Sequence, residues 1–424
     1  MRTVYTGGQV FRNGRLETVD FSVLNGMFER VGDVSDLKDD RIVSLSGYMV
    51  FPGFADVHVH FREPGFSYKE TIFTGSRAAA KGGYTLVGTM PNLNPAPDTK
   101  EHVNEQLKII GRDAGIQVVP YGTITMERKG KTLSDMAGMK ELVIGFSDDG
   151  SGVDDEEMMR SAMLTAKALD KVIAAHCEVM ALVNGGVCHA GEFAKSNSLP
   201  GISSESEWKM IERDLRLAKE TGAKYHVCHI STKESVNLIR KAKAEGVNVT
   251  CETGPHYLIM NDSMLKNEGR YKMNPPIRSE EDRKALVEGF IDGTIDILAT
   301  DHAPHSEEEK SKGFMGSAMG VTGIETAFSM MMTHLVEKGI VPLERLIDSL
   351  TKAPKTRFGF SGFKIREGES ADFTVFDPSK KGVVRGSELV SMGHATPFEG
   401  FEKHGDIVLT VYQGNTVYPY NVEE

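Results

Sequence analysis

The chain has 424 residues, of which 40% are hydrophobic and 26% charged, so it exceeds one typical domain and has ample material for a large globular core. Its formal net charge of −11 argues against nucleic acid and anionic membranes as main partners, and an anionic substrate would need local positive groups. The few cysteines lack disulfide or zinc-finger spacing, the N-terminus has no apolar run of signal-peptide length, and no segment reaches the roughly 20 apolar residues that span a bilayer, so we expect a cytoplasmic protein.

Short strands and tight turns are predicted at both ends of the chain. Residues 1–50 carry the turn signals Gly7-Gly8, Asn13-Gly14 and Asn25-Gly26 between short apolar runs. The C-terminal stretch has the same character, as in ADFTVFD and DIVLTVYQGNTVY. Both ends therefore predict β structure.

The middle of the chain alternates short apolar runs with helical patterns, which predicts parallel βαβ units. Helical stretches include residues 155–170, 204–222 and 233–246. The candidate strands are residues 55–60, 84–90, 116–122, 142–147, 172–176, 225–230, 247–253 and 295–300. Eight runs favour a closed (β/α)8 barrel, and a doubly wound open sheet is the alternative.

Polar residues able to do chemistry follow most of these runs. They are His58, His60, Asn92, Asp148, Asp149, His176, His229, His256 and Asp301, whereas the third run offers only Thr123 and Thr125. Active sites of (β/α)8 barrels are built at the C-terminal ends of the strands. Adjacent residues of a strand face opposite ways, so we expect only one of Asp148 and Asp149 to point inward. His256 receives no role.

The histidines and aspartates at the strand ends indicate a metal site when they are taken together. His58 and His60 stand two residues apart, so both imidazoles point to one face of a strand. Each feature alone fits a surface pair, a core histidine or a turn residue. Four histidines, one of the two adjacent aspartates and Asp301 make six ligands, which suit two ions about 3.5–4 Å apart with a bridging carboxylate. Such ligands favour zinc, with manganese or cobalt as alternatives.

In combination these motifs resemble the amidohydrolase superfamily, and most specifically its dihydroorotase family of the long bacterial type. The motifs are DVHVHFREPG (56–65), TMPNLNP (89–95), FSDDG (146–150), AAHCE (174–178), CHIS (228–231), MNPPIR (273–278) and ATDHAPH (299–305). The resemblance covers nearly the whole chain, and only the segment after His305, SEEEKSKGFMGSAMG, matches loosely. It implies a (β/α)8 barrel at residues 52–356 and a small composite β-sandwich formed by residues 1–51 and 357–424.

The resemblance also implies roles for single residues. His58 and His60 would bind one metal ion, His176 and His229 the second, and Asp149 would bridge the two. Asp301 would bind metal and carry the proton. The implied substrate contacts come from His60, Arg62, Asn92 and His305, from Asn274, and from the backbone at Met319 and Gly320. Of these, Arg62, Asn92 and His305 would hold a substrate carboxylate, and Asn274 with the backbone would contact ring amides.

The implied activity is the reversible hydrolysis of dihydroorotate to carbamoyl aspartate in pyrimidine biosynthesis, by attack of a metal-bridging hydroxide. The alternatives are another cyclic amidohydrolase (hydantoinase, dihydropyrimidinase or allantoinase) and a non-catalytic scaffold for a partner such as aspartate carbamoyltransferase. Arg62 favours dihydroorotate as the substrate, because a guanidinium can bind the carboxylate of dihydroorotate through two parallel hydrogen bonds. The lack of a lysine near the end of residues 142–147 argues against a hydantoinase, because hydantoinases carry a bridging carboxylated lysine there.

Two further expectations concern assembly and motion. A homodimer is expected on general grounds, and association with aspartate carbamoyltransferase is a possible addition. Residues 306–322 are rich in glycine and charge, which is typical of a mobile lid over the site and equally of a solvated loop.

Overall fold

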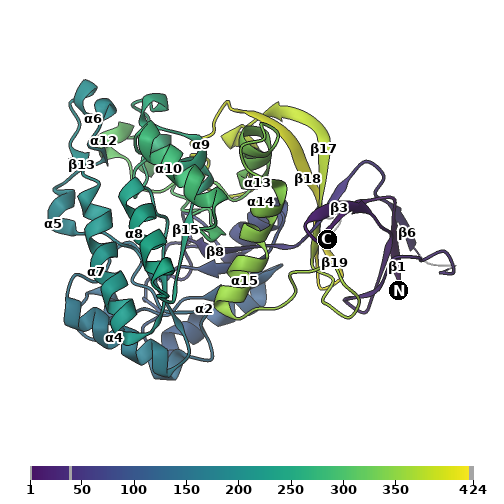
Figure 1. The fold of residues 1–424 in the computed structure, drawn as a ribbon, viewed down its shortest axis with the longest axis horizontal. Coiled ribbons are helices and arrows are strands. Elements are labelled where there is room, and N and C mark those ends of the chain that lie inside the picture. The colour runs from purple at the N-terminus through teal and green to yellow at the C-terminus, as the bar shows by residue number, and fades with distance from the viewer. Residues whose placement is uncertain (1, 38–40, 420–424) are drawn as a thin grey trace.

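The computed structural model describes residues 2–37 and 41–419. It has a large part in which helices surround strands, and a smaller part made of strands, where both marked ends of the chain lie (Figure 1). No helix of the described residues is both long and apolar enough to cross a membrane.

Parallel strands form the centre of the large part. They are β8 (Phe54–Val59), β9 (Tyr84–Thr89), β10 (Gln117–Pro120), β11 (Val172–Ala175), β14 (Lys224–Val227), β15 (Val249–Thr253) and β16 (Ile297–Leu298). β10, β9 and β8 form one sheet and β11, β14, β15 and β16 another, and every pairing in both is parallel. Seven of the eight predicted strands are therefore confirmed; β8 begins and ends one residue earlier than predicted, and the other six are shorter than predicted.

The predicted strand at residues 142–147 is wrong as a regular strand. Phe146 alone forms parallel bridges to Gly122 and to Ile173, and so joins β10 to β11. The neighbouring strand ends at Pro120, which has no N–H to donate, so the ladder beside it is incomplete. The segment occupies the fourth place in the barrel without forming a continuous ladder.

The last strand returns to the first, which closes the barrel. His302 forms a parallel bridge with Val59, and His60 N donates to His302 O at 2.8 Å. Asp56 on β8 joins the same two strands, because its Oδ2 accepts from Thr300 N at 3.0 Å and from Thr300 Oγ1 at 2.6 Å. This closure confirms the (β/α)8 barrel and excludes the open sheet.

Helices cover the outside of the barrel (Figure 1). Three of them confirm the predicted stretches: α4 (Glu156–Ala168), α7 (Glu205–Thr221) and α8 (Lys233–Ala244). α7 ends at Gly222 in the left-handed conformation, with φ of 70°, as its C-terminal glycine predicts. The other helices of eight or more residues are α1 (Ile72–Lys81), α2 (Lys100–Asp113), α10 (Glu280–Ile291) and α14 (Leu343–Leu350).

Shorter elements fill the connections. They are η1 (Met126–Arg128), α3 (Met136–Met139), α5 (Met180–Val183), β12 (Cys188–His189), α6 (Glu192–Ser196), β13 (Gly201–Ile202), α9 (Pro255–Ile259), η2 (Asp262–Met264), η3 (Gly269–Tyr271), α11 (Glu307–Lys310), α12 (Gly313–Gly316), α13 (Ala327–Met331), the π-helical turn η4 (Met332–Val336), α15 (Lys352–Phe358) and η5 (Gly386–Glu388).

Strands from both ends of the chain form the smaller part. One sheet has the order β5 (Met27–Val31), β4 (Phe21–Leu24), β1 (Thr3–Thr6), β6 (Arg41–Ser44). The other has the order β19 (Asn415–Tyr418), β18 (Glu402–Tyr412), β17 (Phe373–Val383), β7 (Met49–Pro52), β2 (Gln9–Arg12), β3 (Arg15–Thr18).

The two sheets pack as a composite β-sandwich. Their shared core includes Tyr5, Val10, Phe21, Phe28, Val50, Phe373, Val375 and Val411. The Asn13-Gly14 turn has φ of 51° and 79°, which confirms the tight turn predicted there. The sandwich is thus present, while the limits 1–51 and 357–424 stay a prediction.

Candidate metal centre

Six side chains meet at the C-terminal ends of the barrel strands. His58 lies on β8 and His60 just beyond it, and the others follow the segment 142–147, β11, β14 and β16. All six are buried: His58, His60, Asp149, His176, His229 and Asp301. The structure therefore brings together every residue that the sequence predicts as a metal ligand.

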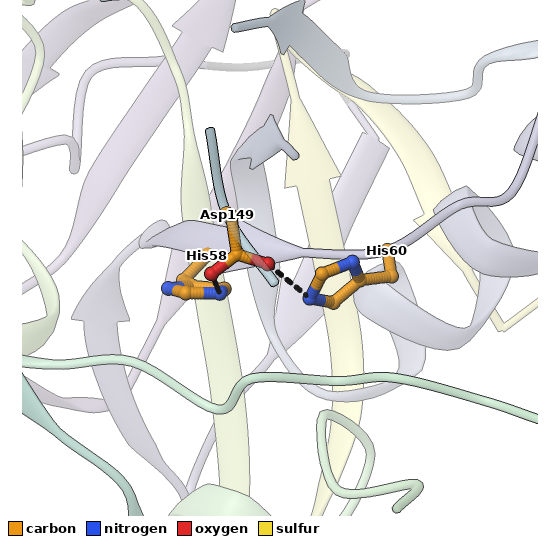
Figure 2. A group of neighbouring side chains, drawn as sticks. All are labelled: His58, His60 and Asp149. Carbon is orange, nitrogen blue, oxygen red and sulfur yellow. Dashed lines mark ion pairs between the residues drawn. The ribbon is translucent and has the colours of Figure 1, made fainter. Parts of the chain in front are cut away.

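The carboxylate of Asp149 is the centre of this cluster. Its Oδ1 lies 3.4 Å from His58 Nε2, 3.4 Å from His229 Nε2 and 3.6 Å from His176 Nδ1. Its Oδ2 lies 3.6 Å from His60 Nε2, and Figure 2 shows the carboxylate between the imidazoles of His58 and His60. One carboxylate thus faces all four histidines.

These distances fit metal coordination better than direct hydrogen bonding. Two atoms that each lie about 2.1 Å from one tetrahedral ion are about 3.4 Å apart. His58 Nε2 and Asp149 Oδ1 are buried and have no hydrogen-bond partner among the described residues. Two groups of ligand atoms lie within 4.8 Å of one another, His58 with His60 and Asp149, and His176 with His229 and Asp149. The residues present therefore fit a pair of ions that share Asp149.

The neighbouring histidines keep the carboxylates of Asp149 and Asp301 deprotonated. Burial by itself would raise the pKa of Asp149, but His58, His176 and His229 hold it well below the usual carboxylate range. Burial would likewise raise the pKa of Asp301, and His58 and His60 lower it. Both carboxylates are therefore ionised at neutral pH and available as ligands.

Asp301 lies beside His58 and His60. Its Oδ1 lies 3.0 Å from His60 Nε2 and 3.5 Å from His58 Nε2. Its backbone has φ of 46°, and His229 and Arg62 also have positive φ, at 31° and 58°. Non-glycine residues rarely adopt this region, and such strain is concentrated at functional sites.

Glu252 on β15 is a functional residue that sequence reasoning missed. It is buried, and its Oε1 accepts from His58 Nδ1 at 2.5 Å. Its Oε2 lies 3.0 Å from His226 Nε2. Glu252 thus fixes the tautomer that leaves His58 Nε2 facing the cluster. A charged residue inside the apolar run of 247–253 was the available signal.

Glu178 is a second residue that the sequence did not single out. It is buried, and its Oε2 lies 3.2 Å from His176 Nε2, so that His176 Nδ1 faces the cluster. Both of its oxygens accept from Asn274 Nδ2, at 2.9 and 3.0 Å. His60 has a comparable partner, because Asn92 Oδ1 lies 2.8 Å from His60 Nδ1. Three of the four histidines are therefore oriented by a named side chain.

The other polar residues near the strand ends have structural contacts. Asp148 turns away from Asp149 and accepts from Ile124 N at 2.8 Å and Thr125 N at 3.1 Å, which confirms that one aspartate points inward. His256 is buried, its ring centroid lies 4.1 Å from that of Tyr257 with the two ring planes at 59°, and burial lowers its pKa to about 4. Its Nε2 has no hydrogen-bond partner in the described chain.

A cavity of about 260 Å³ opens directly above the cluster. It is lined by every cluster residue except His58, and by the residues predicted to contact substrate: His60, Arg62, Asn92, Asn274, His305, Met319 and Gly320. Arg62 is buried there, and its Nε donates to Pro304 O at 3.2 Å. Burial lowers the pKa of Arg62 to about 10, so it remains a cation at neutral pH. No lysine is among the residues that line this cavity.

His305 is held in one neutral form at the edge of the cavity. Burial, reinforced by Arg62 and Lys69, lowers its pKa to about 3. Its Nε2–H donates to Met319 O at 2.8 Å, and its Nδ1 accepts from Lys69 Nζ at 3.3 Å. Arg62 Nη2 lies 3.4 Å from the same Nε2, a contact that cannot be a hydrogen bond once that nitrogen carries the proton. Lys69, which the sequence did not single out, adds a second positive charge, after that of Arg62, beside His305.

Comparison with known sequences identifies close relatives over the whole length. The family model described as dihydro-orotase-like matches residues 47–235. The chain is 46% identical over 422 residues to a dihydroorotase of Geobacillus sp. (strain WCH70), with 99% of each chain covered. It is 44% identical over 411 residues to a dihydroorotase of Fusobacterium nucleatum, with 97% of each covered, and 45% identical over 424 residues to that of Ligilactobacillus salivarius, with 99% of each covered.

Solved structures share the same architecture. The L-hydantoinase (dihydropyrimidinase) from Arthrobacter aurescens has a TM-score of 0.88 at 27% identity, with 98% of this chain and 95% of that chain covered. The dihydropyrimidinase from Brevibacillus agri NCHU1002 has a TM-score of 0.85 at 21% identity, with 98% and 95% covered, and shows the fold alone.

Proposed function

The chain belongs to the dihydroorotase family, and from this premise we propose how its own residues carry out the reaction. The protein is a hydrolase of cyclic amide C–N bonds, and its reaction is the reversible opening of dihydroorotate to carbamoyl aspartate. The observation that carries the residue assignment is the single Asp149 carboxylate facing four histidines below a cavity that Arg62 lines.

We propose two zinc ions at this centre, with manganese or cobalt as substitutes. His58 and His60 would hold one ion, His176 and His229 would hold the other, and Asp149 would be shared by both, in keeping with the ligand distances above. Imidazole and carboxylate ligands match zinc. When bound, such ions would make water a better nucleophile at neutral pH and would polarise the ring carbonyl.

Asp301 moves the proton. Hydrolysis adds water across the ring C–N bond, so the proton lost by the nucleophile must reach the departing ring nitrogen. Asp301 is ionised, lines the cavity and lies beside His58 and His60. Its carboxylate accepts the proton and then donates it to the nitrogen, first as base and then as acid.

Arg62 and Asn92 hold the substrate carboxylate, and Asn274 faces the ring. Since Glu178 occupies Asn274 Nδ2, the amide oxygen Oδ1 is the atom left to accept a ring N–H. Hydantoin has no carboxylate for Arg62, and no lysine lines the cavity to act as the bridging group of a hydantoinase. The site therefore favours dihydroorotate over hydantoin.

An assay of the metal-loaded protein on dihydroorotate and on hydantoin tests this assignment. We expect hydrolysis of dihydroorotate, the reverse cyclisation of carbamoyl aspartate, and loss of both on chelation with recovery when zinc is restored. Metal analysis of the same sample is expected to give two ions per chain. Turnover of hydantoin without turnover of dihydroorotate would refute the substrate assignment.

Arg62→Ala is expected to raise the KM for dihydroorotate by roughly 10- to 100-fold, because a bidentate contact between a guanidinium and a carboxylate is lost. The metal content should stay unchanged, since a guanidinium has no lone pair with which to bind a cation. Steady-state kinetics and metal analysis of the same preparation check this. A variant that loses metal instead would show that Arg62 maintains the metal site and would contradict its role as a substrate contact.

We also propose the setting in which the enzyme works. The described cysteines Cys177, Cys188, Cys228 and Cys251 are all free and buried, which supports a reducing cytoplasm. A homodimer, and association with aspartate carbamoyltransferase, remain proposals that size measurements on the purified protein with and without that enzyme would test.

A further inference from the structure

Lys310, at the end of α11, is a buried cation that binds only backbone carbonyls. Its Nζ donates to Lys272 O at 3.0 Å, to Ala318 O at 2.8 Å and to Gly320 O at 2.7 Å. Lys310 as a whole residue is 8% exposed, and it forms no ion pair within residues 2–37 and 41–419. Burial of a charge is costly unless its donors are satisfied, and here three N–H groups meet three carbonyls.

The carbonyls that Lys310 binds belong to irregular backbone. Lys272 follows η3, and residues 317–320 follow α12 without forming a helix or strand. Gly320 N donates to Lys272 O at 3.1 Å, so Lys310 and Gly320 N share that acceptor. Backbone without strand partners needs other partners when buried. The Lys310 ammonium supplies them for the Ala318 and Gly320 carbonyls.

This turn is one wall of the substrate cavity. Met319 and Gly320 line it, and Met319 O holds His305 Nε2–H. Gly320 has φ of 135°, and a Cβ there would lie 2.7 Å from Ala303 O, so the backbone packs tightly against the cavity floor. A small shift of the turn would therefore move both the wall and His305.

The start of the same segment is anchored independently. Ser306 caps α11 in a capping box with Glu309, and Glu309 pairs with Lys69 at 2.8 Å. These contacts hold residues 306–309 without Lys310, whereas the turn at 318–320 receives two of its hydrogen bonds from Lys310 Nζ. The effect of removing the ammonium should therefore be confined to the cavity wall.

We propose that Lys310 is a positioning residue for substrate: its ammonium holds the Met319–Gly320 backbone, and with it His305, in the shape that binds the ring of dihydroorotate. The inference rests on the proposed function, since it names dihydroorotate as the ligand. It assigns Lys310 no contact with substrate, metal or reacting atoms. It also means that the segment 306–320 is fastened at two places rather than being a freely solvated loop.

The competing explanation is that Lys310 only stabilises the fold. Lys355 on α15 provides a matched control, because it is also buried and its Nζ donates to Gly53 O at 3.1 Å and Gly362 O at 2.7 Å. Lys355 lies outside the residues that line the cavity. Replacement of either lysine by methionine removes a buried ammonium and leaves carbonyls without donors.

The test compares Lys310→Met, Lys310→Gln and Lys355→Met with the wild-type enzyme in zinc content, thermal unfolding, and kcat and KM for dihydroorotate. Kinetics are measured near pH ~6, below the pKa of about 7 that burial gives Lys310, so that all three N–H are present. We expect both lysine-to-methionine variants to unfold at lower temperature. Lys310→Met alone should raise KM, by about tenfold or more, with zinc retained and kcat much less affected. Lys310→Gln, which keeps two N–H donors, should lie between.

Each other result decides against the proposal. An unchanged KM in either folded Lys310 variant would overturn it, as would an equal rise of KM in Lys355→Met or a loss of kcat alone. If both Lys310 variants failed to fold while Lys355→Met folded, Lys310 would be a folding residue and the proposal would be wrong. If the wild-type, zinc-loaded enzyme itself did not hydrolyse dihydroorotate, the proposed function would fail, which is a distinguishable outcome.

Discussion

Replacement of Asp301 by asparagine is expected to lower kcat for dihydroorotate by on the order of 10³-fold, with KM within about threefold of the wild-type value. The amide has nearly the same shape as the carboxylate but accepts no proton at neutral pH. The loss should fall on kcat because proton transfer to the ring nitrogen occurs in the transition state. Asp301 suits this role because it is ionised and its Oδ1 lies 3.0 Å from His60 Nε2.

Metal analysis must accompany those kinetics, since Asp301 also stands within reach of the ligand histidines. We expect Asp301→Asn to retain most of its zinc. Asp296→Asn is the matched control, because Asp296 precedes the same strand, β16, at its opposite end and pairs with Lys243 at 2.6 Å. The N-terminal ends of barrel strands contribute to stability and the C-terminal ends to catalysis, so the control should keep wild-type kcat. If the activity of Asp301→Asn fell only in proportion to its loss of zinc, Asp301 would not be the residue that transfers the proton.

Asp149→Asn should have an effect at least as large, a loss of kcat/KM of on the order of 10³-fold or more together with loss of bound metal. A neutral amide cannot replace a carboxylate shared by two cations, and the ions are expected to supply several kcal/mol of transition-state stabilisation. Among the described residues, Asp149 is the one carboxylate with ion-pair distances to all four histidines. Metal content should fall from two ions to at most one per chain.

The adjacent Asp148 gives a control that differs by a single position. It is also buried, but its carboxylate caps the backbone of Ile124 and Thr125 rather than facing the histidines. Asp148→Asn should therefore cost about 1–3 kcal/mol of stability and keep both ions. Calorimetry and metal analysis of the two variants check the pair. Equal metal loss in both would show that the loop, rather than the bridging carboxylate, controls the ions.

Residues with a periodic or motif-like context could be predicted from the sequence. The helix at 205–221 and the turn at Asn13-Gly14 follow from local rules, namely apolar spacing, a C-terminal glycine and tolerance of positive φ. The six residues of the metal cluster were predictable because each stands in a family motif at a strand end. The regular strand predicted at 142–147 failed because its partner ends at Pro120, which no local pattern of that segment reveals.

Residues whose role depends on a distant partner escaped prediction. Glu252 is significant only because barrel closure places it 2.5 Å from His58, which is 194 positions away in sequence. Glu178 matters because Asn274, 96 positions away, lies 2.9 Å from it. Lys310 looks like one more charge in SEEEKSKG until its burial among three carbonyls is seen.

By itself the sequence determined the alternation of strands and helices and, through its resemblance to a family, predicted a composite sandwich and the residues that meet in the cluster, because periodicity and motifs are local properties of the chain. Only the tertiary structure decided which nitrogen of each histidine faces the centre, which aspartate of the adjacent pair points inward, and what holds the cavity wall. Those choices are made by hydrogen bonds between residues far apart in the chain, and such contacts exist only after the barrel has closed.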